Sequence, residues 1–65
     1  MNKLTEIIYR VRLNHVKDVL KSNTRKIESA IMDNDYLAYN KFRLEQLRLM
    51  SCKSYLENKL SYTTN

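Results

Sequence analysis

Hydrophobic positions in the first half of the chain recur at the spacing of one helix face. Six apolar residues and a threonine, three or four apart, form a continuous stripe: Tyr9, Leu13, Val16, Leu20, Thr24, Ile27 and Ile31. This spacing predicts an α-helix. The stripe stays in phase across Ser22–Thr24, whose residue types favour helix caps. One helix over residues 3–32, capped by Asn2, is therefore expected; a break at Ser22–Thr24, giving three helices, is the alternative.

The same segment carries a second apolar stripe. Its members are Leu4, Ile7, Ile8, Val11, His15 and Val19. An amphipathic helix with one apolar stripe needs one neighbour to cover it, so a helix with two stripes needs two neighbours. The chain is too short to supply all of these neighbours, and we expect it to be part of an assembly.

The second half begins with a turn signal and continues with another doubly striped helix. Asp33, Asn34 and Asp35 tolerate turn geometry, and Asn34 or Asp35 can cap the helix that follows. A helix over residues 36–61 is expected after this turn. One stripe comprises Ala38, Phe42, Leu49, Leu56 and Leu60, with Cys52 at its edge. The other comprises Leu37, Leu44, Leu47, Tyr55 and Tyr62, with Asn40, Ser51 and Asn58 interleaved.

These elements predict an all-α fold with a single domain over residues 1–65. Helices of about 45 and 38 Å, joined by a short turn, form an antiparallel two-helix hairpin. A chain this short buries only about 60% of its unfolded surface, so we expect two hairpins to pair into a dimeric four-helix bundle. The residues predicted at the oligomer interface are Tyr9, Leu13, Val16, Leu20, Ile27, Ile31, Phe42, Leu49 and Leu56.

Composition narrows the chemistry. The chain has no glycine and no proline, one cysteine and one histidine. A single cysteine excludes an internal disulfide and disfavours a zinc site, so no metal or cofactor is expected. The N-terminal residues lack a signal-peptide pattern, and no apolar run approaches the ~20 residues of a membrane span. We expect a cytoplasmic protein without membrane contact.

His15 and Cys52 are the candidates for reactive groups. His15 lies on an apolar stripe, where a packed, hydrogen-bonded histidine is the favoured interpretation over a catalytic base or pH-sensitive contact. Cys52 has Lys53 beside it, and nearby cations activate thiols, but a small buried hydrophobe is the favoured interpretation. No nucleophile stands close to His15 in sequence, so we expect no enzyme.

A basic row is the most suggestive polar feature. The formal net charge is +5, and Lys3, Arg10 and Lys17 recur every seven residues, with Lys21 continuing the row. Asn14 and Arg25 lie beside it. A cationic row of ~27 Å can track several phosphates, which indicates RNA or DNA binding as an alternative function. The competing interpretation is a solvated outer face.

Tyrosines mark a candidate contact with a partner. Tyr36 and Tyr39 stand at the turn and Tyr62 at the opposite end. Tyrosine is enriched at interfaces because it buries area while keeping a polar group. The leading hypothesis is a small non-enzymatic regulator or adaptor that forms a homodimer and contacts a larger protein. Modulators or inhibitors of a host machine, encoded by mobile elements, are often of this kind.

Overall fold

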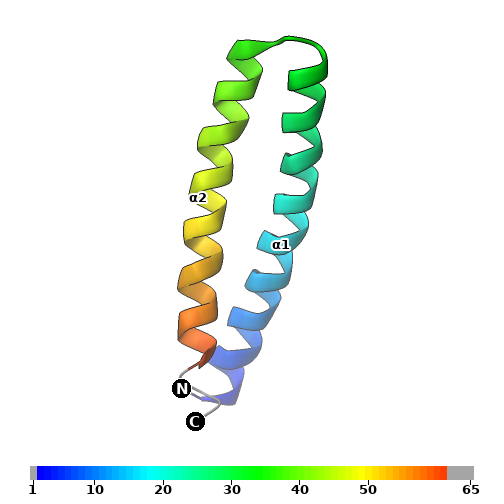
Figure 1. The fold of residues 1–65 in the computed structure, drawn as a ribbon. Coiled ribbons are helices and arrows are strands. Elements are labelled where there is room, and N and C mark those ends of the chain that lie inside the picture. The colour runs from blue at the N-terminus through cyan, green and yellow to red at the C-terminus, as the bar shows by residue number, and fades with distance from the viewer. Residues whose placement is uncertain (1, 62–65) are drawn as a thin grey trace.

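The computed structural model describes residues 2–61, which form an antiparallel helical hairpin (Figure 1). Helix α1 spans Lys3–Met32 and helix α2 spans Tyr36–Ser61, as the sequence predicts. The three-helix alternative is wrong, because the helix is continuous through Ser22–Thr24. The Thr24 hydroxyl donates to the Leu20 carbonyl oxygen at 2.9 Å, so its polar group is satisfied without a break in the helix.

The start of α1 is capped as expected. The side-chain oxygen of Asn2 accepts a hydrogen bond from the Thr5 backbone N–H at 2.8 Å. Such a bond satisfies one of the N–H groups that a helix start leaves unpaired. Glu6 lies in the first turn, where its charge complements the helix dipole, and it forms an ion pair with Arg10 at 2.9 Å.

The turn between the helices is closed by its own backbone. Asn34 adopts φ 55, the left-handed conformation that asparagine tolerates better than most residues. The Asn34 N–H donates to the Ile31 oxygen at 3.1 Å, and the Asp35 N–H donates to the Ala30 oxygen at 2.9 Å. This pattern is a Schellman motif. Asp35 then caps α2, because its side chain accepts from the Ala38 N–H at 3.1 Å.

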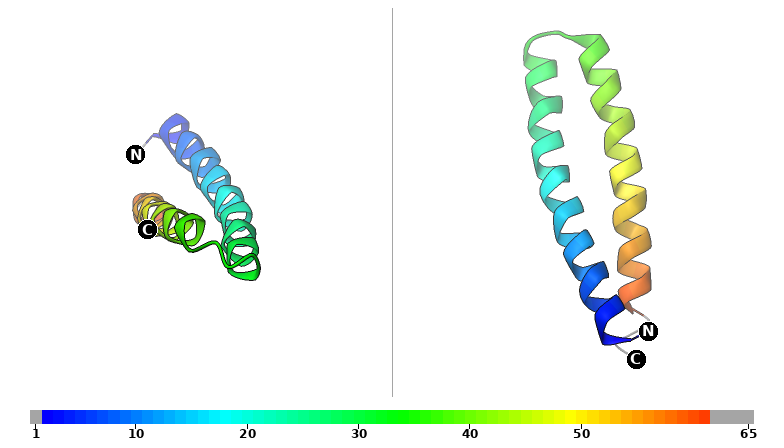
Figure 2. Two further views of the ribbon diagram at one scale, coloured as in Figure 1. Left: turned by 90° about the horizontal axis from the view of Figure 1, so that it is seen from above. Right: turned by 180° about the vertical axis from the view of Figure 1, so that it is seen from behind.

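The apolar core lies toward the end of the hairpin away from the turn. Its buried members are Leu13, Val16, Leu56 and Leu60, and Tyr9 and Leu20 pack against them. Leu56 is the most enclosed of these, with 3% of its surface exposed. Figure 2 shows that the axis of α1 is inclined to the axis of α2.

Toward the turn, the contact between the helices departs from the predicted stripe. Asn23 and Ala30 are buried, whereas Thr24 and Ile31 are exposed. In the predicted stripe, Val16, Leu20 and Thr24 are spaced four and four residues apart. Two such spacings in succession move the stripe around the helix and away from the contact face. The observed contact alternates four and three, and its mean of 3.5 residues keeps one face against a neighbouring helix.

Candidate interaction surfaces

Most residues predicted at the oligomer interface lie between α1 and α2 of the same chain. Leu13, Val16 and Leu56 are buried there, and Tyr9 and Leu20 pack against them. Three more, Ile27, Phe42 and Leu49, are half-buried, and Ile31 is 57% exposed. The hairpin itself covers much of this stripe, so the largest apolar surface open to a second molecule lies elsewhere.

One open apolar surface runs along one side of α1, beside the face that contacts α2. The residues at positions 4, 8, 11 and 15, which we call the α1 strip, are spaced four, three and four apart and therefore share a face. They are Leu4, Ile8, Val11 and His15, all exposed. Leu4 is 68% and Val11 63% exposed, and Ile7 beside them is also exposed. A row of aliphatic side chains in solvent is unfavourable unless another molecule covers it.

A second open surface runs along the whole outer face of α2. Positions three or four apart from residue 37 to residue 58 form what we call the α2 strip. Its members are Leu37, Asn40, Leu44, Leu47, Ser51, Tyr55 and Asn58, all exposed. Leu37 is 85% and Leu44 69% exposed. Leu47, Ser51, Tyr55 and Asn58 also line a shallow open depression on this face.

His15 and Cys52 both line an apolar groove of about 390 Å³ where the two helices meet. Both residues are exposed. Each lies just outside the face that the facing helix covers, so the interpretations of His15 as a packed residue and of Cys52 as a buried hydrophobe stay predictions, which require a second molecule to cover them. Within residues 2–61, no three His, Cys, Asp or Glu side chains come together as metal ligands.

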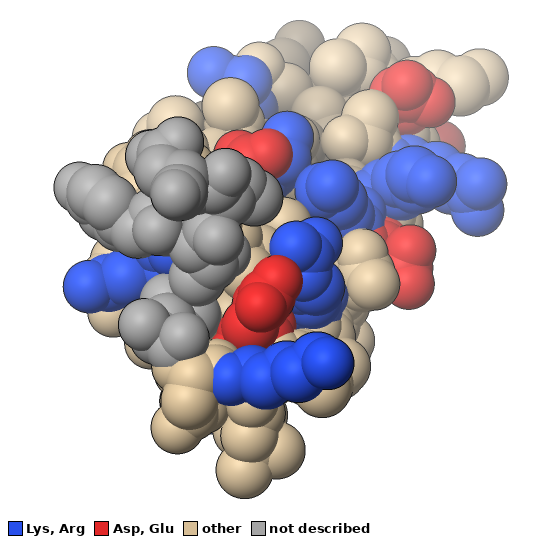
Figure 3. All heavy atoms as spheres, turned by 90° about the horizontal axis from the view of Figure 1, so that it is seen from below, with Lys and Arg blue, Asp and Glu red and all other residues tan. Residues whose placement is uncertain are grey.

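The predicted basic row stays on the surface of α1. All six of its members are exposed, namely Lys3, Arg10, Asn14, Lys17, Lys21 and Arg25. Arg10 donates to Glu6 through Nη2 at 2.9 Å and Nε at 3.2 Å, so part of its charge is compensated. Seen from the end opposite the turn, lysine and arginine side chains alternate with carboxylates on the surface (Figure 3). On α1, Glu6 and Glu28 stand beside the row, so its cationic field is broken by acidic neighbours.

The tyrosines at the turn differ in exposure. Tyr36 is 74% exposed, and Tyr39 is half-buried. With Ala30, Ile31 and Asn34 they line a pocket of about 240 Å³. Tyr62, the third predicted partner contact, lies outside the described residues.

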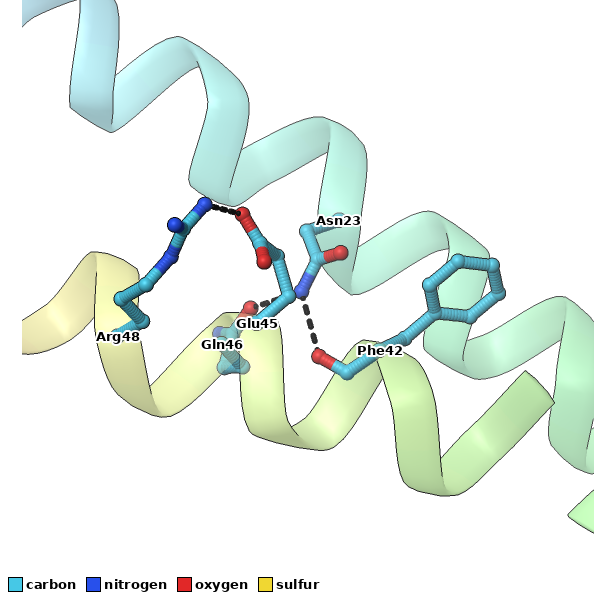
Figure 4. A network of polar contacts seen from close by, with 5 residues as sticks. All are labelled: Asn23, Phe42, Glu45, Gln46 and Arg48. Carbon is cyan, nitrogen blue, oxygen red and sulfur yellow. Dashed lines mark hydrogen bonds and ion pairs between the residues drawn. The ribbon is translucent and has the colours of Figure 1, made fainter. Parts of the chain in front are cut away.

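A polar contact between the helices was missed by reasoning from the sequence. Asn23 donates to both Phe42 and Gln46 across the hairpin (Figure 4). The signal that indicates it is the strict alternation of four and three, which places Asn23 and not Thr24 in line with Leu20 and Ile27.

Comparison with protein-family models, with curated proteins and with solved structures finds no match to this chain. Neither helix in the described part of the chain has an apolar stretch of the length that crossing a membrane requires.

Proposed function

We propose that the chain is a small non-enzymatic regulator that acts through protein–protein contacts. In this proposal it pairs with a second copy into a four-helix bundle and offers another surface to a larger protein, such as a host machine. The observation that supports it is the imbalance between open and covered apolar residues. Twelve large apolar side chains of the described residues are exposed, against five buried apolar residues.

The exposed area supports the same proposal. A compact monomer of 7.8 kDa exposes about 4,400 Å². The chain exposes 5334 Å², which is roughly 1,000 Å² more than that expectation. A protein–protein interface of standard size covers about 800 Å² on each partner. An elongated hairpin of 47 × 14 × 14 Å exposes more surface than a compact monomer of the same mass, and a second molecule packed along it would cover area of this order.

The α1 strip is the surface that suits a second copy. On the helix, the charged residues nearest to it along residues 4–18 are Arg12 and Asp18, which carry opposite charges. Two copies that pair through this strip therefore do not bring charges of a single sign into contact, and electrostatic repulsion between them is avoided. Aliphatic side chains such as Leu4 and Val11 supply the apolar contact.

Sedimentation velocity over a wide range of protein concentration tests this proposal. The wild type should shift from monomer to dimer, and Val11→Asp should remain monomeric and helical, because a charge would be buried in the interface. Asn14→Asp is the matched control, since Asn14 is exposed on another face of α1. A wild type that stays monomeric at every concentration, or a Val11→Asp variant that still dimerises, contradicts the proposal.

RNA or DNA binding is the second candidate function. It is supported by Lys3, Lys17 and Lys21, which are exposed and have no carboxylate within ion-pair distance among residues 2–61. Unpaired cations in a row can neutralise phosphates without first breaking an internal ion pair. The acidic neighbours of the row weaken this candidate relative to the first.

A further inference from the structure

The α2 strip contains no charged residue, although 29% of the chain is charged. Seven exposed positions over six helical turns are leucine, tyrosine, asparagine or serine. A solvated outer face normally carries charges, as the basic row of α1 does. A neutral face with leucines at helical spacing is the pattern of a helix that packs against another helix.

All charges that border this strip are positive. At about 100° per residue, Lys41, Arg43, Arg48 and Lys59 fall within about 90° of the centre of the strip. We call these four residues the cationic rim. The two carboxylates of α2, Glu45 and Glu57, fall about 120° from the centre, toward the face that contacts α1. Arg43 stands on one edge of the strip, and the other three cations stand on the opposite edge.

Ion pairing within the chain leaves most of this charge available. Arg48 is paired with Glu45 (Figure 4). Lys41, Arg43 and Lys59 have no carboxylate within ion-pair distance in the described part of the chain. The Lys59 ammonium lies 5.5 Å from the centre of the Tyr55 ring, so this cation is held against the strip itself.

A second copy of the chain does not fit this surface. Two α2 strips packed together would bring two cationic rims into contact, and like charges across an interface disfavour pairing. The α1 strip of another copy is bordered by Arg12 on one side and by Asp18 on the other, so it offers an acidic edge on one side only. Charge complementarity instead requires a partner with carboxylates on both sides of its apolar stripe.

We propose that the α2 strip binds an amphipathic helix of another protein, in which glutamate or aspartate flanks a leucine-rich stripe. This inference rests on the proposed role in protein–protein contact and assigns the partner class to one surface. Leu44 and Leu47 insert between the apolar side chains of the partner helix, and the cationic rim pairs with its carboxylates. Asn40, Ser51 and Asn58 need polar partners when covered, which restricts the register of binding.

The probe is a synthetic helical peptide with leucines at heptad spacing and glutamates at the flanking positions, labelled for fluorescence anisotropy. A matched peptide has lysine in place of every glutamate, and a third keeps the glutamates but has glutamine in place of every leucine. The full chain should bind the glutamate–leucine peptide at least about tenfold more tightly than either control at low salt, with the preference narrowing as salt rises. Equal binding of the two leucine peptides overturns the assignment of an acidic partner.

Substitutions locate the site. Leu44→Asp with Leu47→Asp should weaken binding at least about tenfold and leave the helix content unchanged, because both side chains lie outside the contact with α1. Met32→Asp, at a residue 83% exposed at the end of α1, is the matched control and should bind as the wild type does. Unchanged binding by the double variant places the peptide elsewhere and overturns the proposal.

A charge swap provides a test that leaves the apolar contact intact. Arg43→Glu with Lys41→Glu and Lys59→Glu reverses the charge of the cations without an ion-pair partner on both edges of the α2 strip, so the variant should prefer the lysine peptide over the glutamate peptide. An unchanged preference overturns the role of the cationic rim. If the glutamine peptide binds as well as the leucine peptide, the surface attracts polyanions in general, which contradicts helix docking and favours nucleic acid. Failure of dimerisation leaves these binding outcomes unaffected, so the two proposals are judged separately.

Discussion

The side-chain amide of Asn23 donates hydrogen bonds to Gln46 Oε1 at 2.8 Å and to the Phe42 backbone oxygen at 2.9 Å, both on the facing helix. Asn23 is only 4% exposed, and its two amide hydrogens match these two acceptors. A shift of α2 by one turn would leave the buried amide without its partners. The pair therefore favours one register of the hairpin, which is the best attested role of a buried asparagine between helices.

Asn23→Ala should lower the free energy of unfolding by about 1–2 kcal/mol, since two hydrogen bonds are lost. Urea unfolding followed by circular dichroism, at one fixed protein concentration, measures the change. Asn14→Ala is the control, because Asn14 is exposed on the outer face of α1. Equal stability of the two variants would show that the Asn23 contacts contribute nothing.

The sequence predicts the hairpin well because both ends of the turn carry local chemical signals. Asn34 and Asp35 stand where a left-handed residue and a helix cap are needed, and Asn2 caps α1 in the same way. These contacts involve residues within five positions of one another. They can therefore be inferred without knowledge of the rest of the fold.

The surfaces are harder to predict, because each helix has two apolar stripes of similar strength. Periodicity shows that Leu13 and Val11 lie on different faces, but not which face the partner helix covers. The buried Asn23 was missed for a related reason: polarity disfavours a core position unless a partner such as Gln46 is known to face it. Packing between helices, and not local propensity, decides these positions.

The Asp35 cap of α2 should contribute about 1 kcal/mol to the free energy of unfolding. Asp35→Ala removes the oxygen that accepts from the Ala38 N–H and should reduce stability by that amount. Asp33→Ala removes the same charge two residues earlier, where the side chain makes no hydrogen bond to the described chain, and should cost much less. Thermal unfolding of both variants gives the comparison; equal losses would assign the effect to charge and not to the cap.

A charge in the apolar core should affect folding, whereas a charge on the α1 strip should affect only dimerisation. Leu13 is buried, so Leu13→Asp should unfold the hairpin, because a desolvated carboxylate costs several kcal/mol. Leu4→Asp, at an exposed position of the α1 strip, should keep the helix content and weaken only dimerisation. Circular dichroism and sedimentation on the same samples separate folding from assembly. A folded Leu13→Asp monomer would show that the apolar core is not needed for the hairpin.

The basic row gives a prediction that separates nucleic-acid binding from protein contact. Arg10→Ala with Lys17→Ala removes two exposed cations and leaves every core residue in place. If the row tracks phosphates, affinity for a structured RNA should fall sharply and the slope of log affinity against log salt should decrease by about two. Dimerisation should not change, because neither side chain belongs to the α1 strip.

Lys26→Ala with Lys41→Ala is the matched control for this test, since it removes the same net charge from positions outside the row. Filter binding to one RNA hairpin and one DNA duplex, each at several salt concentrations, supplies the slopes. If both double variants lose affinity equally, the attraction depends on net charge and not on the row. If neither loses affinity, phosphate contact by Arg10 and Lys17 is excluded, and their cations serve only to keep the outer face of α1 solvated.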